Sequence, residues 1–379
     1  MCERPGFLLR IVRVCFMIHA FATHRKLTSM KKSAKVLLAC SALALTAGSA
    51  VAQEQVVNLY SARHYSTDEA LYSDFAKATG IQVNRVDADD AGILARLKAE
   101  GSASPADVIL LVDAARLHRG EVDGLFKPIQ SKVLNDAIPA NLRSAAAADG
   151  GIAWFGLSTR ARVVVYNKSK VQKDDVDTYE ELGDPKNKGK LCIRSGSHPY
   201  NLSLFGAVTE HLGEQKAEDW LKGMVANLAR APKGGDTDQI KAVAAGECDI
   251  AVTNSYYLAR MMRSTKPEDA AVVNKVGVVF PNQQSWGTHL NIAGGAVARH
   301  SKNQENAVKF LEYLASPQAQ NYFANGNNEW PAAKGVVVDN PALKSMTGGA
   351  PFKSETIPIS AVGANVAKVQ QMLDRVGFK

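Results

Sequence analysis

The chain has 379 residues and a formal net charge of +8, with 45 Lys and Arg residues against 37 Asp and Glu residues. Eight of the basic residues and one of the acidic residues lie in residues 1–52, so the rest of the chain holds 37 basic and 36 acidic residues. A nearly neutral chain beyond residue 52 has no basic surplus for a polyanion, which argues against nucleic acid as a partner.

Residues 30–52 are predicted to form a cleaved export signal. Lys31 and Lys32 supply positive charge, a short apolar run follows over 36–47, and Ala50-Val51-Ala52 supplies the small residues of a cleavage site. We expect cleavage after Ala52 and a working place in the periplasm. Residues 1–29 hold scattered arginines and no signal-type apolar run of their own, so we expect an upstream extension outside the folded protein.

Beyond the signal, short β-branched runs alternate with amphipathic stretches. Strands are expected at 56–60, 81–83 and 108–111, and helices at 68–79 and 91–100. This alternation is the βαβ rhythm of an α/β protein, and the length is ordinary for two domains. For the first helix, Ser66 is the expected N-cap, Glu69 completes a capping box and Gly80 is the expected terminator.

Three turns each carry tyrosine where a strand is expected to end. Tyr65 follows the first strand, Tyr200 lies in the turn at 195–201, and the pair Tyr256-Tyr257 lies in the turn at 253–258. In an open α/β sheet the ligand crevice lies outside the carboxyl ends of the strands. The four phenols are therefore expected to meet in one crevice between two halves of the molecule, as in a hinged binding protein.

Phenols gathered in this way favour a small, hard, highly charged cation. Ionising one phenol of pKa ~10 at pH 7 costs about 4 kcal/mol, so four phenolates cost on the order of 16 kcal/mol. Anionic oxygen suits hard ions, and Fe(III) fits this demand better than Zn(II), Mg(II) or Ca(II). Beyond residue 52 the sequence has no zinc-type Cys or His pair and no acidic calcium loop. The competing interpretation is that these tyrosines pack as the amphipathic edge of a core.

Two cysteines, Cys192 and Cys248, lie beyond residue 52. Each is expected at a strand. In an oxidising compartment the sequence is compatible with a cross-strand disulfide and with two free thiols. Cys40 belongs to the export signal. Its use as a lipidation site is disfavoured because few apolar residues precede it.

Four stretches of the chain stand out for their residue patterns. They are the runs 60–68 (YSARHYSTD) and 162–167 (RVVVYN), then Asn254-Ser255-Tyr256-Tyr257, and a late run from 306 that ends in Asn328-Glu329-Trp330-Pro331. These stretches resemble the ferric-ion-binding proteins of bacterial ABC iron importers, of the transferrin-like Fbp and Fut type. Carried over position by position, the resemblance implies iron ligation by Tyr65, Tyr200, Tyr256 and Tyr257, with His64 as an optional fifth ligand.

The resemblance also implies a fold and a partner. The fold is the α/β, two-lobed periplasmic binding protein fold of type II, with the ligand cleft between lobes joined by hinge strands. One lobe is expected over 53–156 with 286–336, and the other over 157–285 with 337–379. We expect a monomer without catalytic activity that binds Fe(III), closes around it and delivers it to the permease of an ABC importer in the inner membrane.

Three arginines are candidates to balance phenolate charge or to hold an anion such as carbonate or citrate beside the iron. They are Arg63, Arg162 and Arg260. An acidic loop at 87–90 is expected to be a solvated face rather than a set of ligands.

Two other classes of protein compete with this interpretation. A binding protein for an oxyanion, a polyamine or another organic solute would share the fold and the signal but would hold no metal. An exported hydrolase is disfavoured because the sequence has no Gly-x-Ser-x-Gly elbow and no acid/base pair tied to a nucleophile.

Overall fold

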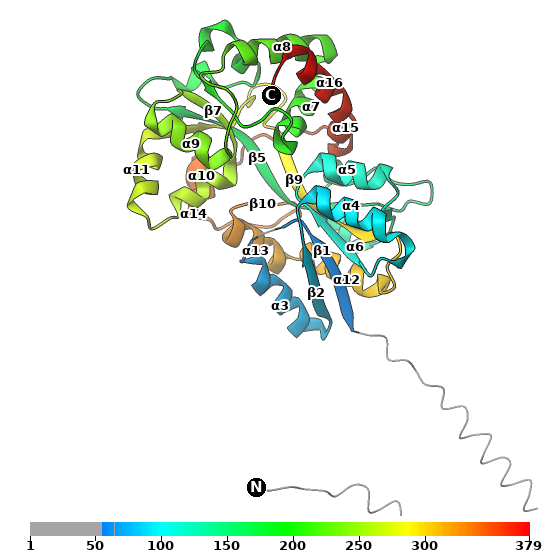
Figure 1. Cartoon of the computed structure of the whole chain (residues 1–379). Helices are drawn as coiled ribbons and strands as arrows, with labels where there is room; N and C mark the ends of the chain where they lie inside the picture. Colours follow the sequence, from blue (N-terminus) through cyan, green and yellow to red (C-terminus); the bar gives the residue numbers. More distant parts are fainter. Residues whose placement is uncertain (1–54, 64) are drawn as a thin grey trace, which may run out of the picture. The chain divides into compact units, whose positions relative to one another are not determined.

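The computed structural model describes residues 55–63 and 65–379 (Figure 1). The predicted upstream extension 1–29, the predicted export signal 30–52 and His64 lie outside the described residues. In the part of the chain that is described, no helix is both long enough and apolar enough to cross a bilayer.

The first group of elements alternates strands with helices, as the sequence predicts. In chain order these are β1 (Val56–Ser61), α3 (Asp68–Thr79), β2 (Gln82–Asp87), α4 (Asp90–Glu100), β3 (Val108–Leu111), α5 (Ala114–Val122), β4 (Phe126–Lys127) and α6 (Lys132–Ala137). β1 pairs in parallel with both β2 and β3. The segment that carries Tyr65 follows the carboxyl end of β1 and leads into α3.

The second group of elements follows a long strand, β5 (Phe155–Asn167). In chain order these are β6 (Leu191–Cys192), α7 (Pro199–Leu212), α8 (Glu214–Ala226), α9 (Asp236–Ala245), β7 (Ile250–Asn254), α10 (Ser255–Met262), α11 (Pro267–Lys275) and β8 (Val276–Val279). β6 and β7 pair in parallel, so both point their carboxyl ends the same way.

The elements of the last group pack first against the first group of elements and then against the second. In chain order these are β9 (Leu290–Ala298), α12 (Gln304–Leu314), α13 (Pro317–Asn327), β10 (Trp330–Pro331), α14 (Pro341–Met346), α15 (Ile359–Ala364) and α16 (Val366–Val376). β9 lies between β3 and β5 and is antiparallel to both.

The long strand β5 connects the two parts of the sheet, whose order is β2-β1-β3-β9-β5-β7-β6. Its first half pairs with β9, and its second half, from Arg162 onward, pairs with β7 and β8. Nearly every residue of β5 is buried, which is typical of a strand covered on both faces. Figure 1 shows β5 and β9 passing between the two groups of elements.

Separate hydrophobic cores lie on either side of this connection. Leu59, Phe75 and Phe310 belong to the core of the first group. Phe205 and Met372 belong to a core of the second group, which has a further core on the other face of its strands. The C-terminal segment contacts both sides, because Ile359 at the start of α15 packs into the first core while α16 packs into the second.

The helix α3 has the predicted bounds but not the predicted cap. Gly80 ends it in the left-handed conformation with φ 75°, as the sequence predicts. The capping box at Ser66 and Glu69 is wrong: Thr67 is the N-cap residue, and no side chain caps the helix there. The Thr67 hydroxyl bonds to Asn327 instead, so a tertiary contact replaces the local one.

Candidate metal centre

The structure brings the four predicted tyrosines together. Tyr65 lies just before α3, Tyr200 is in the first turn of α7, and Tyr256 and Tyr257 are in the first turn of α10. The Oη atoms of Tyr200 and Tyr256 are 3.5 Å apart. The Tyr65 ring meets the Tyr256 ring edge-on at 6.2 Å between centroids, and the Tyr257 ring stacks on Tyr256 at 4.2 Å. Phenols from both groups of elements therefore share one site.

The turn before α7 is shaped so that Tyr200 points into this site. Pro199 occupies the start of the helix, where a missing N–H does no harm. Nδ1 of His198, the N-cap residue, accepts the Tyr200 N–H over 3.2 Å, and the His198 ring packs edge-on against the Tyr200 ring. Burial, followed by the charge of Arg194, lowers the pKa of His198 to about 3, which keeps the imidazole neutral and able to accept.

Arg162 connects the two turns of the second group. Its guanidinium pairs with the buried Asp236 over 2.7 Å and bonds to Asn201, the neighbour of Tyr200. Asp236 in turn accepts the backbone N–H of Asn254, which begins the turn toward Tyr256. Arg162 is thus placed to hold both tyrosine-bearing turns, and its guanidinium makes no hydrogen bond to a phenol among the described residues.

When no cation is bound, the surroundings of the phenols oppose their ionisation. Burial raises the pKa of Tyr200 and of Tyr256 well above the ordinary value. The pKa of Tyr65 is raised by burial and then by the carboxylate of Glu329. The charges of the neighbouring phenolates, Tyr65 first and then Tyr200, raise the pKa of Tyr256 further, because like charges repel at this distance. A cation among the oxygens would reverse all of these shifts at once.

Arg160 and Glu329 are site residues that the sequence reasoning missed. Arg160 Nη2 pairs with Glu329 Oε1 over 2.6 Å, and both side chains are fully buried. Tyr65 Oη donates to Glu329 Oε1 over 3.1 Å, and the Arg160 guanidinium lies 5.6 Å from the centroid of the Tyr256 ring. Burial alone would raise the pKa of Glu329, but Arg160 and then Arg63 lower it to about 2.

The signal for these residues was present but weak. Arg160 and Arg162 are two positions apart in a strand with an otherwise apolar second half, so both side chains share one face. Two buried arginines on one face require buried acceptors. Glu329 stands in the late run that resembles the family, and nothing local in the sequence ties it to either arginine.

The other two candidate arginines occupy different environments. Arg63 is buried, with its Nε 2.7 Å from Asp68 Oδ2 and its Nη1 3.3 Å from Glu329 Oε2, and its guanidinium lies over the Tyr65 ring. Arg260 is exposed, and its guanidinium lies 5.2 Å from the centroid of the Tyr257 ring. Both arginines therefore contact the tyrosine cluster from its edge.

A cavity of about 460 Å³ adjoins Tyr200. His198 and Arg63 line it, together with the acidic loop at 87–90. Within that loop, Asp89 caps α4 through the Gly92 N–H, and Asp90 accepts the Val112 N–H. These carboxylates thus have structural partners. Across the described residues, no group of three or more His, Cys, Asp or Glu side chains could hold a metal ion.

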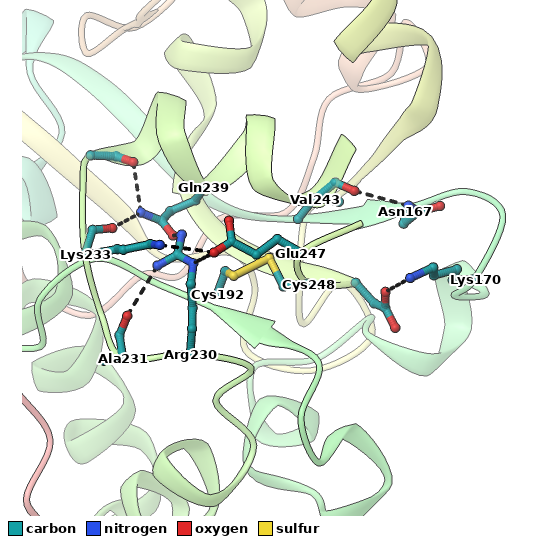
Figure 2. The surroundings of a disulfide bond; sticks show 12 residues. Asn167, Lys170, Cys192, Arg230, Ala231, Lys233, Gln239, Val243, Glu247 and Cys248 are labelled. Atoms are coloured by element: carbon teal, nitrogen blue, oxygen red, sulfur yellow. Dashed lines mark hydrogen bonds and ion pairs between the residues drawn. A yellow bond between two sulfur atoms is a disulfide. The ribbon is translucent and has the colours of Figure 1, made fainter. Parts of the chain in front are cut away.

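Cys192 and Cys248 are joined by a disulfide, with Cα atoms 5.9 Å apart (Figure 2). Cys192 ends β6, and Cys248 lies just before β7, so the bridge ties the two parallel strands that lead to Tyr200 and Tyr256. Both cysteines are buried, and the ion pair of Arg230 with Glu247 lies beside them.

Comparison with known proteins places this geometry in context. The model of the family of bacterial extracellular solute-binding proteins matches residues 70–347. Iron uptake protein A1 of Synechocystis sp. is 45% identical over 327 residues, which cover 86% of this chain and 88% of that protein. The major ferric iron-binding protein of Neisseria meningitidis serogroup A is 28% identical over 341 residues, which cover 89% of this chain and 97% of that protein.

Solved structures give the same picture. The structure of Trichodesmium FutA in complex with iron and citrate is 51% identical in sequence to this chain, with a TM-score of 0.81. The match covers 86% of this chain and 100% of that one. The structure of apo FutA2 from Synechocystis is 42% identical in sequence to this chain, with a TM-score of 0.79. The match covers 86% of this chain and 100% of FutA2. The expected two-lobed periplasmic binding protein fold is confirmed.

Proposed function

The chain belongs to the bacterial extracellular solute-binding proteins, and on that premise we propose that it binds Fe(III) through its tyrosine cluster and delivers it as the periplasmic component of an ABC iron importer. The observation that carries the proposal is the convergence of four phenols from three separate turns, with two Oη atoms 3.5 Å apart. The likeness to iron uptake protein A1 and to a FutA structure with iron and citrate supports it. The protein binds and releases its cargo and catalyses no reaction.

The charges around the cluster explain why the cargo is a trivalent cation. Arg63, Asp68, Arg160 and Glu329 form a buried set of two cations and two anions, which is neutral as a whole. This set leaves the charge of four phenolates uncompensated. Fe(III) offsets most of that charge and prefers anionic oxygen ligands, whereas a divalent ion offsets less of it.

The ligands we propose are Tyr65, Tyr200, Tyr256 and Tyr257. Three of these phenols come from α7 and α10, and they form a half-site that receives the ion first. Tyr65 must give up its proton and its hydrogen bond to Glu329 before it can join. We propose that it joins last, with His64 as an optional fifth ligand and with carbonate or citrate completing the coordination where it is bound.

The division into lobes follows from the same arrangement. We propose one lobe over 53–156 with 286–336 and the other over 157–285 with 337–379, joined by hinge strands within β5 and β9. Tyr65 then comes from one lobe and the other three tyrosines from the second. An ion that all four hold binds the closed arrangement better than the open one, so it favours closure. The permease in the inner membrane recognises the closed, loaded monomer.

The location we propose is the periplasm, reached by export and cleavage after Ala52. A relative from Serratia marcescens, named as an Fe(3+)-binding periplasmic protein and 28% identical over 345 residues, supports this.

The test is a titration of the purified protein with ferric citrate, followed by visible absorbance. Phenolate-to-iron charge transfer is expected to give a red to orange colour at one iron per protein. The double variant Tyr256→Phe/Tyr257→Phe is expected to lose the colour. Tyr322→Phe is the matched control, because the Tyr322 hydroxyl bonds to Asp74 and lies outside the cluster. A wild-type protein that stays colourless contradicts the proposal.

A further inference from the structure

Glu355 lies at the centre of a buried polar network outside the tyrosine cluster. His289 Nδ1 bonds to Glu355 Oε1, and His211 Nε2 lies 3.1 Å from Glu355 Oε2. On the other side of the His289 ring, Nε2 lies 3.0 Å from Ser203 Oγ. Ser203 and His289 are fully buried, and Glu355 is 3% exposed. Four side chains from three separate segments are therefore connected by hydrogen bonds that exclude water.

The Glu355 end of this network is fixed to the strands that connect the two groups of elements. The Glu355 N–H donates to the carbonyl of Thr288 over 3.1 Å. His289 lies directly before β9, and its carbonyl accepts the N–H of Arg162 in β5 over 2.9 Å. The His289 N–H donates to Tyr179 Oη over 3.1 Å. Backbone bonds thus hold both His289 and Glu355 in place, independently of α7.

Ser203 and His211 both come from α7, the helix whose first turn carries Tyr200. With 3.6 residues per turn, the directions of these three side chains around the helix lie within about 80° of one another. The network therefore contacts the Tyr200 face of α7 at two points roughly two turns apart. Two attachments on one face fix the rotation of the helix about its axis, and they fix with it the direction in which the Tyr200 side chain leaves the helix.

The chemistry of Glu355 orients the His289 ring. Burial raises the pKa of Glu355, but the charge of His289 and then the hydrogen bond of His211 lower it below its ordinary value. Glu355 is therefore a carboxylate at neutral pH, which accepts hydrogen bonds and donates none, so His289 Nδ1 carries a proton. This bond turns Nε2 toward Ser203, where it can bond to the hydroxyl.

We propose that Ser203, His289, Glu355 and His211 form a positioning network that directs Tyr200 toward the iron from outside the ligand set. The inference rests on the proposed function. Among the described residues the Tyr200 hydroxyl has one hydrogen-bond partner, Tyr256, at the long distance of 3.5 Å. The direction of the phenol is therefore set by its helix rather than by its own hydroxyl. Groups that orient a metal ligand account for about 10- to 100-fold in metal affinity.

The experiment compares two variants of α7 that each lose one buried hydroxyl. Ser203→Ala removes the bond to His289 and leaves every proposed ligand in place. Thr209→Val is the matched control, because the Thr209 hydroxyl donates to the carbonyl of Phe205 within the same helix over 2.7 Å. Both proteins are loaded with ferric citrate, and stopped-flow absorbance follows release to a competing chelator. Tyr200→Phe, with and without Ser203→Ala, completes a double-mutant cycle.

Ser203→Ala is expected to release iron about tenfold faster than the wild type and to shift the maximum of the visible band. Thr209→Val should match the wild type in both measurements. In the Tyr200→Phe background, Ser203→Ala should change the release rate no further, because the serine acts through that phenol. A wild-type rate and band for Ser203→Ala overturns the proposal, and so does an effect of equal size with and without Tyr200.

Hydrogen exchange in the iron-free protein gives a measurement that does not depend on iron. The backbone amides of residues 200–203 should exchange faster in Ser203→Ala than in the wild type, because the first turn of α7 loses its attachment. Thr209→Val should leave them unchanged. If the wild type stays colourless with iron, the proposed function fails. The exchange rates then decide whether the network fixes α7, and unchanged exchange in Ser203→Ala overturns the inference.

Discussion

Tyr65 donates a hydrogen bond to Glu329 over 3.1 Å, although the two residues are 264 positions apart in the sequence. The carboxylate fixes the phenol in the iron-free protein, and it also raises the pKa of that phenol. Glu329 therefore holds Tyr65 near its working position while making its ionisation more difficult. The ionisation of Tyr65 therefore depends on the charge of Glu329.

Replacing Glu329 by glutamine is expected to let the protein keep iron at lower pH. The substitution removes an anion next to Tyr65, so the pKa of Tyr65 falls and protons compete less well for its phenolate. The pH midpoint of iron release, followed by loss of the visible band, should shift downward. A midpoint that stays in place or moves upward would show that Glu329 does not oppose ionisation of Tyr65.

The same substitution is expected to destabilise the iron-free protein. Arg63 and Arg160 lose their shared partner, and breaking a buried ion pair costs about 3–5 kcal/mol. Glu305→Gln on the exposed face of α12 is the matched control and should change the free energy of unfolding by less than about 0.5 kcal/mol. Urea unfolding followed by circular dichroism measures both.

The acid stability of the iron-free protein should depend on Glu329. Its folded pKa of about 2 lies below the usual 4.5, so its contribution is full above about pH 5 and is lost as the pH falls through 4.5 toward 2. That contribution is about 3 kcal/mol. Urea unfolding from pH 6 to pH 2 should show this loss in the wild type, and Glu329→Gln should lack it. Parallel curves for the two proteins would contradict the assignment.

Tyr65→Phe should behave differently from changes in the other three tyrosines. The half-site of Tyr200, Tyr256 and Tyr257 remains, so the variant should still colour with iron. Without the fourth phenolate, iron no longer links both sides of the cleft, and release to a competing chelator should become at least about tenfold faster. Stopped-flow absorbance measures that rate. An unchanged rate would remove Tyr65 from the ligand set.

Removing the disulfide should loosen the half-site and lower stability. The Cys192–Cys248 bridge spans 56 positions, and closing such a loop stabilises the folded chain by about 4 kcal/mol on the chain-entropy model. Cys192→Ser/Cys248→Ser should unfold at lower urea and bind iron more weakly, because the strands leading to Tyr200 and Tyr256 are no longer tied. A double variant with wild-type affinity for iron would limit the bridge to a role in stability.

Much of the fold and part of the site could be predicted from local sequence. The βαβ rhythm and the bounds of α3 follow from patterns within a few residues. Tyr256 follows directly after the end of β7, and Tyr200 lies in the first turn of the helix that follows β6. The cap of α3 was predicted wrongly because Thr67 bonds to Asn327, far along the chain. Arg160 and Glu329 escaped prediction for the same reason, since a charge is buried only where a distant partner meets it.

A crystal structure of the iron-loaded protein, with data collected at the iron absorption edge, tests the central claim most directly. The account predicts one anomalous peak with the Oη atoms of Tyr65, Tyr200, Tyr256 and Tyr257 each at about 2 Å, a usual metal–oxygen bond length. An iron atom bound elsewhere, or held by fewer than three of these phenolates, would contradict it.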